Sequence, residues 1–176
     1  MSGMSTYFEV LLEKSAKEAV GLAAYVAGLP LQERGLKTWN DNTQLAKNVA
    51  EVQSLLKNGK AVDAIAIADK IQVPRYGASI PFIILLKAQV LDEAGKTKEA
   101  YEKLLTFFAK EPTEKINNQL LIYGNKINKA SAAVNKDVLY VRDTTARQAP
   151  VFNLETYLTK GKSSLNDYKG KVVLLT

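Results

Sequence analysis

Apolar residues recur every three or four positions through most of the first 135 residues, which is the spacing of amphipathic helices. A first helix is predicted over residues 5–28, where Gly28 and Pro30 end the pattern. Residues 31–42 are less regular and hold the only tryptophan, Trp39, which we expect to be a buried packing anchor. Five further helices are predicted, over residues 43–57, 60–72, 79–93, 96–110 and 113–134.

The helices between residues 43 and 110 form two successive pairs of similar length, each joined by a short glycine turn. Aligning the pairs places Gly59 opposite Gly95 and Ala64 opposite Ala100, a period of 36 residues. A helix–turn–helix period of this size is typical of an α-solenoid, in which neighbouring hairpins stack and bury a continuous core. The stacked hairpins leave a concave surface.

The second helix pair resembles the tetratricopeptide repeat. Small, large apolar, turn and terminal positions of that motif are filled by Ala88, Leu91, Gly95, Ala100, Leu104, Phe107 and Pro112. The first pair fits less well, since Pro74 comes two residues early; its matching residues are Val52, Leu55, Gly59, Ala64, Ala68 and Ile71. The resemblance covers residues 45–114, and the alternative is a plain helical bundle that uses the same small residues for packing.

The resemblance implies that ligand-facing side chains lie on the first helix of each pair. Carried over by motif position, the candidate partner-binding residues are Gln53, Lys57, Gln89, Asp92 and Glu93. The alternative is that they are ordinary exposed polar residues.

The pattern changes after Asn135. Residues 137–141 are rich in β-branched and aromatic side chains and predict a strand. Val172–Leu175 is a run of four apolar residues, as expected of a strand buried on both faces. We therefore divide the chain into a helical repeat domain, residues 1–135, and a linker with β segments, residues 136–176.

The tail resembles the opening of a TlpA/ResA-like thioredoxin-fold domain, of the AhpC/TSA type. Its ordered series is Ala149-Pro150-x-Phe152-x-Leu154, a spacer ending in Gly161-Lys162, then Ser164-Leu165-x-x-Tyr168-x-Gly170-Lys171 followed by Val172–Leu175. The family implies a short opening strand before the glycine turn, a first central strand at Val172–Leu175, and a CxxC motif directly after it.

The series stops at Thr176, and the chain contains no cysteine, so the resemblance implies a truncated redox domain. Either the natural chain continues past Thr176 into a CxxC or the redox domain has been lost, and a series that ends inside a predicted strand favours the first. If the redox resemblance holds, the family implies an extracytoplasmic, periplasmic location. A strand without its sheet exposes unpaired backbone, so we expect the β tail to fold back onto the helices, to pair with the same segment of another chain in a homo-oligomer, or to fray.

Composition narrows the chemistry further. The chain has neither cysteine nor histidine, which removes thiol nucleophiles, zinc–thiolate sites and histidine acid–base catalysis. We expect no catalytic residues, no metal and no cofactor. The net charge of +6 is spread along the helices, and the eight tyrosines are scattered, so nucleic acid is not an expected partner. No apolar stretch is long enough to cross a bilayer.

The sequence therefore predicts a mainly α fold, a tetratricopeptide-like α-α superhelix or bundle with a short β tail. The expected function is a protein–protein interaction or dimerisation module of a thiol-disulfide oxidoreductase, without redox activity in these residues. The alternative is a stand-alone adaptor protein with no redox link. In both cases the expected partner is a protein or peptide.

Overall fold

The structure, a computed structural model, describes residues 2–147, 153–155 and 161–170. Its contacts divide the chain into two compact units, residues 1–144 and 145–176. Within the described residues there are eight helices and one two-stranded antiparallel sheet, so the predicted mainly α class is confirmed. The helical unit runs beyond the boundary predicted at residue 135.

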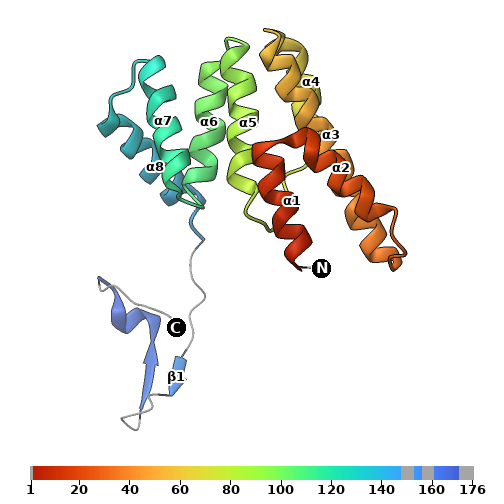
Figure 1. The fold of residues 1–176 in the computed structure, drawn as a ribbon. Helices are drawn as coiled ribbons and strands as arrows, with labels where there is room; N and C mark the ends of the chain where they lie inside the picture. The colour runs from red at the N-terminus through yellow and green to blue at the C-terminus, as the bar shows by residue number, and fades with distance from the viewer. Residues whose placement is uncertain (1, 148–152, 156–160, 171–176) are drawn as a thin grey trace. The chain divides into compact units, whose positions relative to one another are not determined.

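The helices of the first unit pack mainly against their neighbours in the sequence, as Figure 1 shows for α4 to α7. Additional contacts join α3 to α5 and α5 to α7, the first helices of successive pairs. The helices are therefore arranged as successive hairpins whose first helices contact one another. The helices are α1 (Ser2–Lys14), α2 (Ala16–Ala27), α3 (Glu33–Lys57), α4 (Ala61–Lys70), α5 (Ile80–Glu93), α6 (Thr97–Phe108), α7 (Glu114–Lys126) and α8 (Ser131–Thr145).

The two predicted glycine turns have the same geometry. Gly59 and Gly95 adopt φ values of 68° and 80°, in the left-handed region that favours glycine. The following N–H closes each turn: Lys60 donates to the Leu55 carbonyl at 2.9 Å, and Lys96 donates to the Leu91 carbonyl at 2.8 Å. The 36-residue period therefore describes two equivalent helix hairpins.

A third hairpin of the same kind joins α7 to α8, and the sequence analysis missed it. Asn128 takes the glycine position with φ 62°, and the Lys129 N–H donates to the Gly124 carbonyl at 2.8 Å. Two predictions are therefore wrong: the single helix over residues 113–134, and the strand over residues 137–141, which lies within α8. Asparagine tolerates the left-handed conformation, so no glycine was needed to mark the turn.

The N-terminal predictions need two further corrections. The helix predicted over residues 5–28 is interrupted at Ser15, whose φ and ψ are −154° and 81°. Helix α3 begins at Glu33, ten residues before the predicted start at residue 43. Trp39 lies on this early part of α3 and is 2% exposed, packing edge-on against Phe8 of α1 with ring centroids 5.9 Å apart. The prediction that Trp39 is a packing anchor is confirmed.

The core of the helical unit consists of two apolar clusters that meet on α5. Ile83, Leu86 and Val90 of α5 belong to the first cluster, whose other members come from α1 to α4 and Ile71. Ile84 and Ala88 belong to the second cluster, shared with α6, α7 and α8. Since opposite faces of α5 are buried in different clusters, this helix is the structural centre of the repeat.

The second unit contains a β-hairpin. Strand β1 (Asn153–Glu155) pairs antiparallel with β2 (Lys162–Ser164), with Leu154 opposite Ser163. A short 3-10 helix, η1 (Leu165–Tyr168), follows, and a capping box between Ser164 and Asp167 fixes its start. A short strand thus precedes Gly161, while Ala149, Pro150, Phe152 and the predicted strand Val172–Leu175 lie outside the described residues.

Candidate functional site

A groove of about 450 Å³ lies between α3 and α5. Its apolar lining is supplied by Leu56, Phe82, Leu85 and Leu86. Its polar lining is supplied by Gln53, Lys57, Gln89 and Glu93, four of the five candidate residues from the sequence. The groove is thus the place where the structure brings these predicted residues together.

The repeat explains why they converge. Gln53 and Gln89 occupy equivalent positions of the first helix in successive hairpins, as do Lys57 and Glu93. Within each helix the two residues are four positions apart and therefore share one face. Because α3 and α5 contact each other directly, these two faces line one groove.

The polar side chains of the groove offer both hydrogen-bonding senses and both signs of charge. The Gln89 Nε2 group donates to Glu93 Oε1 at 2.7 Å, which fixes the orientation of the Gln89 amide. That bond uses an N–H and leaves the Gln89 carbonyl oxygen as an acceptor within the described part of the chain. Lys57 contributes a cation from α3 and Glu93 an anion from α5. Such a lining suits a peptide backbone, which both donates and accepts hydrogen bonds.

The apolar part of the lining was not singled out from the sequence. Phe82 and Leu85 are half-buried, whereas Leu86 is only 4% exposed. One feature of the sequence could have predicted this lining: Phe82 and Leu85 lie on the same face of α5 as Gln89. Sequence periodicity identified these residues as apolar helix positions, but it could not show that α3 leaves part of them uncovered.

Asp92, the fifth candidate, lies elsewhere. Its carboxylate accepts a hydrogen bond from Thr97 Oγ1 at 2.8 Å and forms an ion pair with Lys126 of α7. The Asp92 side chain is 11% exposed. It therefore joins the α5–α6 turn to the end of α7 and does not line the α3–α5 groove. Burial, followed by the charge of Asp92, raises the pKa of nearby Tyr123 to about 12.

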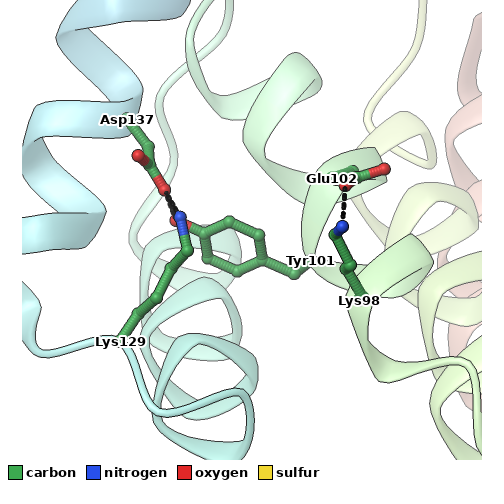
Figure 2. A network of polar contacts seen from close by, with 5 residues as sticks. All are labelled: Lys98, Tyr101, Glu102, Lys129 and Asp137. Carbon is green, nitrogen blue, oxygen red and sulfur yellow. Dashed lines mark hydrogen bonds and ion pairs between the residues drawn. The ribbon is translucent and has the colours of Figure 1, made fainter.

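A second polar cluster attaches α8 to α6 (Figure 2). The Tyr101 hydroxyl donates to Asp137 at 2.7 Å, and Lys129 forms an ion pair with the same carboxylate. Burial and the hydrogen bond to Asp137 raise the pKa of Tyr101. The hydrogen bond from Lys129, then that from Tyr101, lowers the pKa of Asp137. At neutral pH Tyr101 therefore stays protonated and Asp137 stays ionised, so the hydrogen bond between them is kept. Such a pair suits a structural role rather than proton transfer.

Two other hollows have a larger volume but are less suited to a ligand. One of about 670 Å³ lies between α4 and α6, where the exposed Lys96–Glu99 ion pair forms part of its lining. The other, of about 630 Å³, lies among α6, α7 and α8 and includes Arg142, whose Nε donates to the Ala109 carbonyl. Neither contains a residue that the repeat register identifies as partner-facing, so we take the α3–α5 groove as the candidate site.

The described residues show no arrangement suited to metal binding, since nowhere among them do three or more aspartates or glutamates converge. None of the helices in the described part of the chain is long and apolar enough to cross a membrane. Comparisons of the chain with protein-family models, with curated proteins and with solved structures give no match.

Proposed function

We propose that the helical unit is a peptide-binding interaction module and that the α3–α5 groove is its binding site. One observation carries the proposal: four residues chosen by repeat position, on two different helices, line a single groove with an apolar floor. Apolar surface supplies most of the free energy of a peptide contact, and the rim of polar groups sets its orientation.

The ligand that fits best is a short peptide segment with an apolar side chain for the floor. Leu56, Phe82 and Leu85 offer that floor, and the amides of Gln53 and Gln89 pair with the peptide backbone. Lys57 and Glu93 each favour an opposite charge on the flanking ligand residues.

We further propose that this module serves a thiol-disulfide oxidoreductase located outside the cytoplasm. The support is the ordered sequence series in the tail, together with a β-hairpin in which β1 precedes Gly161. A stand-alone adaptor protein with the same groove is the alternative. The coding sequence downstream of residue 176 discriminates between them: a CxxC within about ten codons supports the redox link, and a stop codon there excludes it.

Selection of random dodecapeptides displayed on phage against the immobilised chain tests the groove. We expect one enriched family of peptides with an apolar anchor. Fluorescence polarisation with a labelled, enriched peptide should then show weaker binding to the double variant Gln53→Ala/Gln89→Ala. Loss of two hydrogen bonds, at about 0.5–1.5 kcal/mol each, corresponds to a rise in Kd of about 5-fold to 140-fold.

The matched control is Lys98→Ala, on α6, where the side chain is 81% exposed and does not line the groove. Its Kd should equal that of the unaltered chain. Equal binding by the double glutamine variant and the control, or no enrichment at all, would exclude the α3–α5 groove as a peptide site.

A further inference from the structure

We propose that the surface holding α1 is also a dimerisation surface, which accepts α1 either from its own chain or from a second copy. The proposal is independent of the peptide groove. It rests on three observations: an in-phase apolar pattern across Ser15, the absence of a helix-breaking residue there, and the identity of the segments that hold α1.

The buried face of α1 continues into α2 without a change of phase. Its members follow one another at three- and four-residue steps on both sides of Ser15, as in one uninterrupted helix. They are Phe8, Leu12, Ala16, Ala19, Ala23 and Val26, each between 0% and 3% exposed.

The chain bends at Ser15, between α1 and α2 (Figure 1), although the local sequence there also favours a continuous helix. Neither glycine nor proline occurs between residues 4 and 20, and the Ser15 side chain makes no capping hydrogen bond. Helical hydrogen bonds persist on both sides: the Ser15 N–H donates to the Leu11 carbonyl, and the Ala19 N–H donates to the Ser15 carbonyl. The bend is therefore imposed by what α1 contacts and not by residue 15 itself.

Helix α1 contacts the neighbouring α2, and three further contacts come from segments distant in sequence. Phe8 packs on Trp39 of α3, and Glu9 accepts a hydrogen bond from the Ala78 N–H before α5 at 3.1 Å. Glu13 forms an ion pair with Lys115 of α7 at 2.8 Å. A second copy supplies the same three partners. Exchange therefore keeps these three contacts and straightens two helices, and association costs entropy, which is the logic of domain swapping.

Cross-linking tests the exchange directly, because the chain has no cysteine of its own. Glu13→Cys and differently tagged Lys115→Cys chains, unfolded and refolded together at high concentration, are treated with a short bis-maleimide. We expect a covalent dimer containing one chain of each kind. The double variant Glu13→Cys/Lys115→Cys, refolded when dilute, shows by cross-linking within one chain that the reagent spans the pair.

The control pair replaces Lys115→Cys by Lys98→Cys, on an exposed position of α6 where Lys98 pairs with Glu102 of the same helix. A second measurement compares Ser15→Ala with Ser15→Gly by light scattering. Alanine is favoured over glycine about fivefold per helical position, so two straightened helices predict a dimer Kd about 25-fold lower for Ser15→Ala. Mixed dimers no more abundant than with the control pair, or equal dimer Kd values for the two Ser15 variants, would overturn the proposal.

Discussion

Helix α5 packs against α3 on one side and against α7 on the other. We call these two helix–helix interfaces the α3–α5 seam and the α5–α7 seam. The same repeat position has a different role in each of them. In the α3–α5 seam the position is Leu56, which lines the groove with Gln53 and Lys57. In the α5–α7 seam the equivalent residue is Asp92, which pairs with Lys126 and accepts from Thr97. One seam is left open with apolar lining, and the other is closed by a polar link.

The closed α5–α7 seam contributes to stability, whereas the open α3–α5 seam leaves a surface on which a ligand can bind. An ion pair whose carboxylate is largely buried, together with an additional hydrogen bond, fixes the geometry of the α5–α7 contact but leaves little uncovered apolar surface for a ligand. A leucine at the same position cannot close the seam, so its surface stays available. Equivalent positions in a repeat need not share a role, which is why motif register alone also selected Asp92.

The largest effect is expected where α8 approaches α7. A Cβ at Gly124 would lie 2.7 Å from Val134 Cγ2. Gly124→Leu restores the residue found at the equivalent Leu55 and Leu91, yet we expect it to reduce the free energy of unfolding by about 2–3 kcal/mol through overpacking. Thermal and urea unfolding measure the loss. The matched control is Gly21→Leu in α2, where nothing lies within 4 Å of the added Cβ; it should stabilise by up to about 1 kcal/mol.

The next effect concerns the closed seam itself. Asp92→Leu places in the α5–α7 seam the residue type found at the equivalent Leu56. It also leaves Lys126 and Thr97 without their shared acceptor. We expect a loss of about 1–2 kcal/mol in urea unfolding. Asp41→Leu is the control, because its ion pair with Lys37 is exposed, at 67% and 78%, and should contribute under about 0.5 kcal/mol. Equal losses in the two variants would contradict a structural role for Asp92.

The central helices could be predicted from sequence because their signals are local. Pro81 lies in the first turn of α5, Gly59 and Gly95 mark turns, and Thr113 caps α7 by accepting from the Ile116 N–H. The polar lining of the groove followed from the same register. The agreement therefore comes from positions where one residue type is required by backbone conformation or capping.

The errors occur where the deciding contacts are distant in sequence. Ser15 interrupts a helix because Phe8 packs on Trp39, and no local pattern reports that contact. Residues 137–141 have strand-forming side chains, but Val138 is buried against the second cluster as part of a helix. Register alone could not show that Asp92 has a structural role, since that role depends on the positions of Lys126 and Thr97.

A smaller effect is expected at alkaline pH in the closed part of the helical unit. Tyr123, beside Asp92, has its pKa raised from 10.0 to about 12, and burial also raises that of Tyr101. The unfolded chain loses these protons first, so stability is retained below pH 10 and falls as pH rises toward 12. After allowance for solvent screening, we expect Tyr123 to contribute about 1 kcal/mol to this fall. Spectrophotometric titration checks it: Asp92→Asn should lower the pKa of Tyr123, whereas Asp41→Asn should leave it unchanged.

The smallest effect is expected at the ion pair between α1 and α7. Lys115 and Glu13 are 70% and 46% exposed, so Lys115→Ala should change the free energy of unfolding by no more than about 0.5 kcal/mol. Helix α1 is held instead by Phe8 and Leu12, which are 3% and 0% exposed. Lys98→Ala provides the control for loss of an exposed lysine. A loss above about 1 kcal/mol for Lys115→Ala alone would mean that charge, as in the α5–α7 seam, fixes α1. A negligible loss in the free energy of unfolding would mean that apolar contacts hold α1, as apolar residues characterise the α3–α5 seam.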